Sequence, residues 1–167
     1  GKEDTWYYGT GELIGNSTRS PGAPFRGDGI FKSTDGGRSW TALLSTQSNE
    51  PASFSSPFMY VWDIETNPNS EDDEVIAAIF GGVVKSLDGG QSWTTTLGDD
   101  RLNLAPGSNL NTIASIFFTD IHRTSNGMFY ASLSSETNDA NQLSTLGGVY
   151  GSSNGLNWTK IINLETS

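Results

Sequence analysis

Residues 29–40 read GIFKSTDGGRSW, and residues 82–93 read GVVKSLDGGQSW. Residues 148–158 read GVYGSSNGLNW, which is the same pattern with one residue deleted. Each copy runs from a short apolar segment through a turn rich in Ser, Asp or Asn and Gly to a tryptophan. The tryptophans that close the copies are Trp40, Trp93 and Trp158. A pattern that recurs at this spacing indicates one supersecondary unit per copy.

The segments before the second and third copies also resemble each other. Residues 59–80 read MYVWDIETNPNSEDDEVIAAIF, and residues 115–133 read SIFFTDIHRTSNGMFYASL. Both contain an Asp-Ile pair in an apolar run, then a turn, then a second apolar run. Short runs rich in β-branched and aromatic residues, bounded by Gly, Asn, Asp, Ser and Pro, are typical of strands. Helical periodicity is almost absent, so the sequence predicts an all-β chain.

Each complete unit is expected to form four antiparallel strands. The expected strands are 5–10, 29–33 and 39–44 in the first unit; 59–66, 74–80, 83–86 and 92–97 in the second; and 113–122, 127–133, 148–151 and 157–162 in the third. The first unit begins at the second strand of the pattern. Four-stranded sheets repeated at roughly 50 residues are typical of the blades of a β-propeller, and a β-sandwich is the weaker alternative.

We therefore expect one propeller domain, of which this chain is a fragment with about three blades. The units are 1–45, a partial blade, then 46–98 and 99–167. A stack of repeats needs neighbours to bury each apolar face. The expected partners are therefore the remaining blades of a longer polypeptide or other copies of this chain.

The repeated turn has a physical logic. The carboxylate of Asp35 can accept backbone N–H groups of its own turn. Gly36 and Gly37 permit positive φ without steric cost, and Trp40 is expected to start the next strand and pack its ring over the turn. In the third copy Asn154 keeps the acceptor but loses the charge. The residues expected to hold the turns are Ser33, Asp35, Gly37 and Trp40; Ser86, Asp88, Gly90 and Trp93; and Ser152, Asn154, Gly155 and Trp158.

The pattern Ser-x-Asp-Gly-Gly-x-Ser-Trp strongly resembles the Asp-box (BNR, sialidase-like) repeat, which the first two copies match fully and the third matches in part. The segment TWYYGTGE at 5–12, followed by the first copy, is similar to large secreted bacterial multidomain propeller proteins, many of them exported by type IX secretion. The resemblance implies that the turns are structural and that the protein is secreted or lies on the cell surface. It implies either a non-catalytic module for binding or scaffolding, in adhesion or in polysaccharide or protein recognition, or part of a sialidase- or xyloglucanase-like glycoside hydrolase.

The composition of the chain excludes several classes of binding partner. The chain has 167 residues, 9 Lys and Arg against 19 Asp and Glu, a net charge of −10 and no cysteine. An acidic protein is repelled by nucleic acid and by anionic membrane surfaces, and no apolar run reaches the 18 residues that span a bilayer. We expect no nucleic-acid partner, no membrane insertion, no cofactor and no metal, because one carboxylate per turn cannot supply the six to eight oxygens that calcium takes. The acidic run 70–74 is expected to be a solvated turn.

The alternation of antiparallel strands predicts where a ligand could bind. It places the repeated turns at one end of the sheets and the long connections at the other. These connections are 11–28, 45–58, 98–112 and 134–147. Long loops often carry function, although they can equally be tolerated surface insertions. In the first connection the candidate ligand-binding residues are Glu12, Arg19, Arg26 and Asp28, the last two within an Arg-Gly-Asp tripeptide that is frequent by chance.

Catalysis of glycoside hydrolysis would require two carboxylates. Glycoside hydrolysis needs a pair roughly 5–10 Å apart across the sugar bond, and Asp63 and Asp120 form the best pair because they lie on the innermost strands of neighbouring units. Their equivalent place in the repeat indicates a structural role instead. His122 takes the place of Glu65 in the preceding unit, which explains it as a strand residue. The Arg-Ile-Pro motif of sialidases is absent, so we expect a binding module and keep a hydrolase as the alternative.

Overall fold

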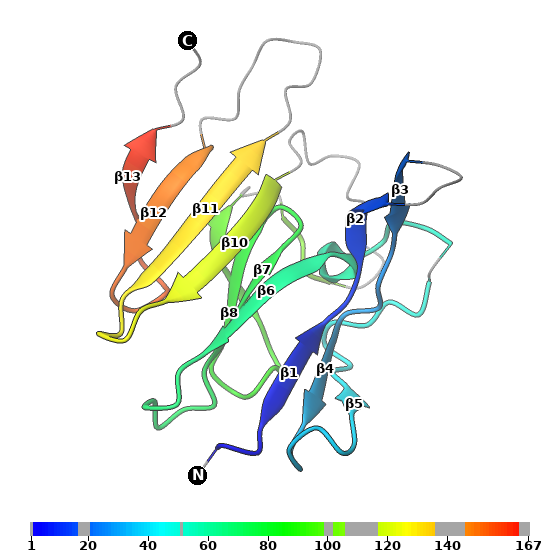
Figure 1. The fold of residues 1–167 in the computed structure, drawn as a ribbon, viewed down its shortest axis with the longest axis horizontal. Coiled ribbons are helices and arrows are strands. Elements are labelled where there is room, and N and C mark those ends of the chain that lie inside the picture. The colour runs from blue at the N-terminus through cyan, green and yellow to red at the C-terminus, as the bar shows by residue number, and fades with distance from the viewer. Residues whose placement is uncertain are drawn as a thin grey trace.

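The computed structural model shows an all-β protein (Figure 1). The structure describes residues 2–16, 21–50, 52–98, 102–105, 117–135 and 146–163. Within these ranges, antiparallel strands form three sheets and a separate two-stranded ribbon, and one 3-10 turn is the helical content. The prediction of an all-β chain is confirmed.

The first sheet has three strands in the order β1-β4-β5. They are β1 (Trp6–Gly9), β4 (Ile30–Ser33) and β5 (Thr41–Ala42). They correspond to the last three strands of the expected four-strand pattern, as the sequence predicts for the first unit. The side chains of β1 alternate, so that Trp6 and Tyr8 are exposed on the outer face while Tyr7 packs toward the second sheet.

The second sheet has four strands in the order β6-β7-β8-β9. They are β6 (Val61–Thr66), β7 (Val75–Ile79), β8 (Gly82–Ser86) and β9 (Thr94–Gly98), and the 3-10 turn Pro57–Met59 precedes β6. Every residue of β7 and β8 is buried. A strand that reads as a continuous apolar run is typical of a sheet covered on both faces, and here a sheet lies on each side.

The third sheet repeats the same topology, in the order β10-β11-β12-β13. Its strands are β10 (Phe117–Arg123), β11 (Phe129–Ser135), β12 (Gly148–Ser152) and β13 (Thr159–Asn163). Even the irregularities correspond, because the last two strands shift register at Val83/Val84 in the second sheet and at Val149/Tyr150 in the third. The repeat therefore extends to the position of a β-bulge.

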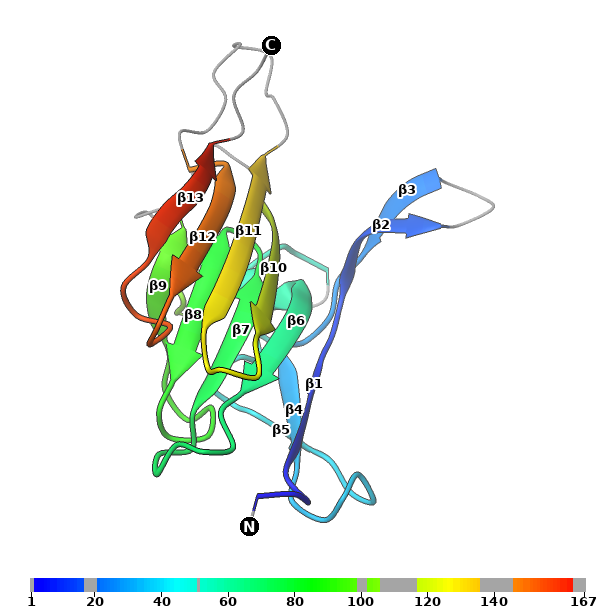
Figure 2. The same cartoon turned by 60° about the vertical axis from the view of Figure 1, so that its left-hand side comes forward.

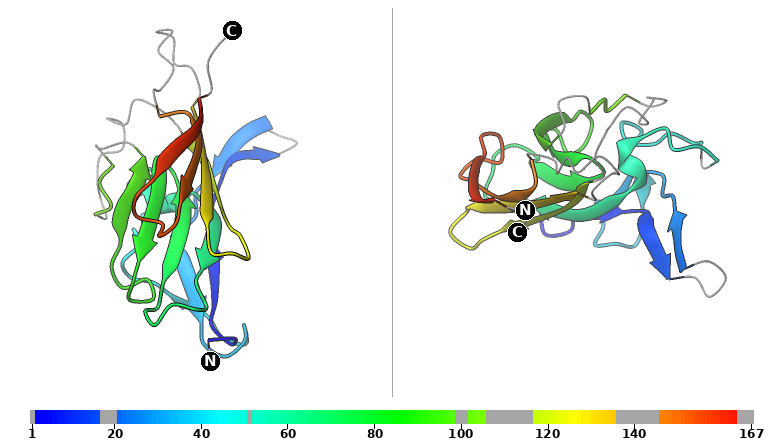
Figure 3. Two further views of the ribbon diagram at one scale, coloured as in Figure 1. Left: turned by 90° about the vertical axis from the view of Figure 1, so that its left-hand side faces the viewer. Right: turned by 90° about the horizontal axis from the view of Figure 1, so that it is seen from above.

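Two apolar layers hold the sheets together, and β7 contributes to both. Its Ala77 and Ile79 pack into the cluster shared with the first sheet, which also contains Ile30. Its Ile76 and Ala78 pack on the opposite side, in a cluster shared with the third sheet. Seen from above, the second sheet lies between the other two (Figure 3).

One expectation about the fold is wrong. The stretch 11–28, expected to be a long loop, contains a ribbon of β2 (Glu12–Asn16) and β3 (Pro21–Phe25) that projects away from the sheets (Figure 2). Two prolines weigh against a strand in the sequence because they cannot donate a ladder hydrogen bond. A two-stranded ribbon tolerates them because both strands are edges.

The two ends of the first sheet differ as the sequence predicts. The β2–β3 ribbon lies at the end opposite the turn 33–40, which joins β4 to β5 (Figures 1 and 2). The connection after β5 lies with the ribbon end, because the backbone N–H groups of Ser48 and Asn49 bind the carboxylate of Asp28. In the part of the chain that the structure describes, no helix is long and apolar enough to cross a membrane.

Candidate functional site

The three repeated turns are here called the Ser–Trp turns, and they comprise residues 33–40, 86–93 and 152–158. In each, the first serine connects the two sides of the turn. The hydroxyl of Ser86 donates to Asp88 Oδ1 at 2.7 Å and accepts the N–H of Gly90 at 2.8 Å. Ser33 and Ser152 make the equivalent pairs of bonds.

The aspartate of the first two turns closes each turn from the other side. Asp88 Oδ1 accepts the N–H groups of Gln91 and Ser92, both at 2.9 Å, and its Oδ2 accepts the Ser92 hydroxyl at 2.6 Å. These hydrogen bonds, the Ser92 hydroxyl first, lower the pKa of Asp88 to about 2. The same arrangement with Ser39 lowers the pKa of Asp35 to about 2. The predicted role of the two carboxylates as acceptors within their own turns is confirmed.

Protonation of the turn aspartates at low pH should remove this stabilisation. A carboxyl whose pKa is lower in the folded than in the unfolded chain contributes stability above its unfolded pKa of about 4, and the contribution is lost as pH falls toward its folded value. We expect Asp88→Asn to lose less stability than the native chain between about pH 4 and pH 2, because Asn154 shows that an amide fits this place. Urea unfolding at several pH values measures this. Parallel pH profiles for the two proteins would contradict it.

The tryptophans of the second and third turns reach the preceding sheet. The indole N–H of Trp93 donates to the Ser45 hydroxyl at 3.2 Å, and its ring centroid lies 5.6 Å from that of Phe58. The indole N–H of Trp158 donates to Thr96 Oγ1 at 3.2 Å. The rings of Trp40 and Trp93 lie against Gly37 and Gly90 of their own turns, as expected for Trp40, whereas the contacts of Trp93 and Trp158 with the preceding unit were not predicted. None of the three tryptophans starts a strand, because β5, β9 and β13 each begin one residue later.

Trp40 is the exception. Its N–H donates to the carbonyl of Gly37 in its own turn at 3.1 Å, and 42% of the residue is exposed. Its ring contacts Tyr8 edge-on, with centroids 6.3 Å apart. The same turn sequence thus leaves Trp40 on a surface, whereas it places Trp93 between sheets.

Whereas Trp93 and Trp158 contact the preceding unit, a lysine of each of the first two sheets contacts the turn of the following sheet. Lys85 donates to the carbonyl of Asn154 at 2.6 Å and pairs with Glu74 at 3.0 Å. Lys32, in the equivalent place of the first sheet, lies 3.4 Å from the carbonyl of Gly89. This role of the lysines was not predicted from the sequence, although the shared Lys-Ser before the first two turns is the signal for it.

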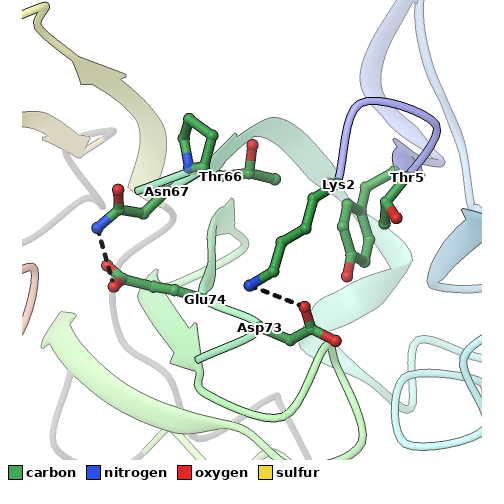
Figure 4. Close-up of a pocket in the computed structure, with 8 residues that line it drawn as sticks. Lys2, Thr5, Thr66, Asn67, Asp73 and Glu74 are labelled. Carbon is green, nitrogen blue, oxygen red and sulfur yellow. Dashed lines mark hydrogen bonds and ion pairs between the residues drawn. The ribbon is translucent and has the colours of Figure 1, made fainter. Parts of the chain in front are cut away.

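A small polar hollow lies beside these contacts (Figure 4). Lys2 reaches across it to pair with Asp73 at 3.1 Å, and Asn67 donates to Glu74 at 3.2 Å. Its volume of about 40 Å³ leaves room for a few water molecules at most. The hollow therefore belongs to the packing between sheets. The acidic run is a largely solvated turn, as expected, because Glu71, Asp72 and Asp73 are exposed. The Glu74 side chain at its end is nearly buried in its ion pair with Lys85.

The fold brings the two candidate catalytic carboxylates together. Burial raises the pKa of Asp63, and the nearby charge of Asp120 raises it further. Each carboxylate also accepts the N–H of its own following residue, Ile64 at 2.8 Å and Ile121 at 3.0 Å.

The raised pKa of Asp63 gives a second prediction. The folded chain disfavours the ionised form of Asp63. The free energy of unfolding is therefore highest below the unfolded pKa of this group, and it falls as pH rises through the folded pKa. We expect Asp63→Asn to raise the melting temperature at pH 7 and to leave it nearly unchanged at pH 3. Calorimetry at both values measures this, with Glu12→Gln on the exposed ribbon as control. A melting temperature lowered at pH 7 would contradict it.

His122 does not complete a catalytic arrangement with these carboxylates. Its Nδ1 lies 3.2 Å from Oε1 of Glu65, and the same oxygen accepts the N–H of Arg123 at 3.0 Å. The exposed imidazole occupies the strand position equivalent to Glu65, as predicted. Among the described residues, no group of three or more His, Asp and Glu could hold a metal ion.

The candidate ligand-binding residues that the structure describes lie in different environments. Glu12 and Arg26 are exposed at the base of the ribbon, and Arg26 interacts with the hydroxyl of Tyr60. The carboxylate of Asp28 accepts the N–H groups of Ser48 and Asn49 and the Gln47 amide, so it holds the following connection. Arg19 lies outside the described residues. Phe25, which the sequence analysis did not select, is exposed beside Glu12.

No protein-family model matches the chain, and no curated protein matches it. Its function is therefore inferred from the geometry of its own residues.

Proposed function

We propose that the chain forms blades of an Asp-box β-propeller that serves as a non-catalytic module for binding or scaffolding at the cell surface or outside the cell. The observation that carries the proposal is the repeated contact between sheets. Trp93 and Trp158 each donate an indole N–H to a hydroxyl of the preceding unit, Ser45 just after β5 and Thr96 on β9. Lys32 and Lys85 each reach a carbonyl in the following turn. A unit that joins the next unit in the same way builds a stack of sheets, and a propeller is such a stack arranged around an axis.

The carboxylates support a module without catalysis. Asp35 and Asp88 use both carboxylate oxygens inside their turns. Asp63 and Asp120 each accept the backbone N–H of the residue that follows, which gives both a structural role in their strands.

We place the binding surface at the ribbon end of the first sheet. There an exposed aromatic ring, Phe25, lies with the charged side chains of Glu12 and Arg26. Aromatic residues and arginine are enriched where proteins bind partners. The ligand we propose is a surface polymer, either a polysaccharide or a protein segment. The proposed location outside the cell follows the resemblance to secreted propeller proteins.

Binding to a panel of insoluble polysaccharides and immobilised surface proteins tests the proposal. The double variant Phe25→Ala/Arg26→Ala should lose at least about tenfold in affinity, which corresponds to about 1.4 kcal/mol. Arg38→Ala is the matched control, because Arg38 is exposed in the Ser–Trp turn at the opposite end. Equal losses for both variants, or binding that neither variant changes, would contradict the placement of the site.

A glycoside hydrolase remains the second candidate because one observation favours it. Asp63 has a raised pKa next to a second carboxylate, as a general acid requires. Incubation with the same polysaccharides separates the two functions. Hydrolysis that Asp63→Asn abolishes would establish the enzyme, whereas binding without product release supports the module.

A further inference from the structure

The outer face of the first sheet carries an exposed aromatic surface. Tyr8, Thr10, Phe31 and Trp40 line an apolar hollow on it. Tyr8 is 60% exposed and Trp40 is 42% exposed. Among the described residues, no sheet covers this face. Contiguous apolar surface of this kind marks an interaction site, and the repeated contacts inside the chain indicate what covers it.

Twice inside the chain, a Ser–Trp turn packs against the sheet that precedes it. The tryptophan finds a hydroxyl there, Ser45 for Trp93 and Thr96 for Trp158. The turn glycine lies against an aliphatic side chain of that sheet. A Cβ on Gly90 would overlap Leu43, and one on Gly155 would overlap Ile76.

A lysine of the preceding sheet completes the contact. Lys32 and Lys85 each approach a carbonyl of the following turn. Each interface is therefore defined by three partners: a hydroxyl, an aliphatic side chain and an ammonium group. All three come from the unit that precedes the turn, either on its strands, as Ile76, Lys85 and Thr96 do, or directly after β5, as Leu43 and Ser45 do.

The turn of the first sheet has the same groups but lacks these partners. The indole N–H of Trp40 turns back to Gly37 of its own turn. A Cβ on Gly37 would meet only the Trp40 ring, at 3.7 Å, and one on Gly36 would meet Asp4. The Trp40 turn thus has the groups that dock the other two turns. Among the described residues, no other sheet contacts them.

We propose that the outer face of the first sheet binds a further antiparallel sheet of the same repeat. The sheet that fits carries a lysine immediately before its turn serine, and it presents an aliphatic side chain and a Ser or Thr hydroxyl on or directly after its strands. On docking, the Trp40 N–H leaves Gly37 and donates to that hydroxyl. This inference rests on the proposed propeller and names the partner of its open face.

The third sheet of a second copy does not fit this description. Its residue before the turn serine is Gly151, where Lys85 stands in the second sheet. At the bulge of its last strand, exposed Ile161 takes the place of Thr96. The third sheet therefore offers apolar surface but neither the ammonium group nor the hydroxyl. The partner is a repeat sheet that has both.

Two substitutions can turn the third sheet into such a partner. Gly151→Lys adds the lysine, and Ile161→Thr adds the hydroxyl. The added Cβ at Gly151 would lie 2.9 Å from the Ile161 side chain, which the second substitution shortens. The double variant should then associate head to tail, its third sheet on the Trp40 face of another molecule. We expect association at least roughly tenfold stronger than that of the native chain, from one charged and one neutral hydrogen bond.

Light scattering over a concentration series measures the association, and the indole N–H resonances of the tryptophans report its place. The Trp40 resonance should shift with concentration in the double variant, and adding Trp40→Ala should abolish the association. If the double variant associates no more strongly than the native chain while Trp93 and Trp158 stay protected from hydrogen exchange, the partner chemistry is wrong. If the native chain associates equally well through Trp40, the partner is a second copy and the proposal is overturned. If Trp93 and Trp158 are themselves unprotected, the stacking behind the proposed function fails instead.

Discussion

Trp93→Ala is expected to lower the free energy of unfolding by about 3 kcal/mol, whereas Trp40→Ala lowers it by less than about 1 kcal/mol. Trp93 packs in the core between the first two sheets, beside Phe58, and donates a hydrogen bond to Ser45. Its removal leaves a cavity and an unpaired hydroxyl. Because the ring is half-buried, the loss should lie at the lower end of the range for large aromatic residues.

Trp40 is the matched control because it closes the same turn sequence on an exposed face. Urea unfolding of both variants, followed by circular dichroism, gives the two free energies. Equal losses would mean that the tryptophan stabilises its own turn rather than the contact between sheets. A loss below about 1 kcal/mol for Trp93→Ala would mean that the ring contributes little to either.

Lys85→Met is expected to lower the free energy of unfolding by about 3–5 kcal/mol. Lys85 and Glu74 are nearly buried, with side chains 6% and 9% exposed, and their charged atoms are 3.0 Å apart. Without the lysine, a carboxylate stays buried without its counter-charge and the carbonyl of Asn154 loses its donor. Removing one member of such a pair costs more than the pair itself contributes.

Lys32→Met provides the comparison. Lys32 lies 3.9 Å from Asp73, and that carboxylate is 47% exposed, so solvent screens the pair. We expect a loss of less than about 1 kcal/mol. The double variant Lys85→Met/Glu74→Gln should regain about half of the loss of Lys85→Met, because it also removes the buried charge. No recovery in the double variant would show that the lysine acts mainly through Asn154.

Features that depend on neighbouring residues could be predicted from the sequence. The Ser–Trp turns are determined by groups two to four residues apart, such as Ser86, Asp88 and Ser92. Their bonds follow from local geometry alone. The order of the strands in each sheet could be predicted from the repeat, since strands that follow one another within a unit pair as neighbours, even across a long connection such as 11–28.

Features that depend on how the sheets pack against one another could not be predicted from the sequence. Lys85 and the carbonyl of Asn154 are 69 residues apart in sequence, and no local pattern fixes their distance. The approach of Asp63 to Asp120 was predicted from their equivalent places in the repeat. The effect of Asp120 on the pKa of Asp63 required coordinates. The β2–β3 ribbon was missed because its prolines weigh against strands that here have only one partner each.

Hydrogen exchange of the three indole N–H groups tests the central claim, that the turn tryptophans join successive sheets. The bonds of Trp93 and Trp158 cross between sheets, whereas that of Trp40 stays in an exposed turn. We predict that the first two exchange more than about tenfold more slowly than Trp40 in the native chain, because exchange from them requires opening the interface. Exchange of Trp93 and Trp158 as fast as that of Trp40 would contradict the account.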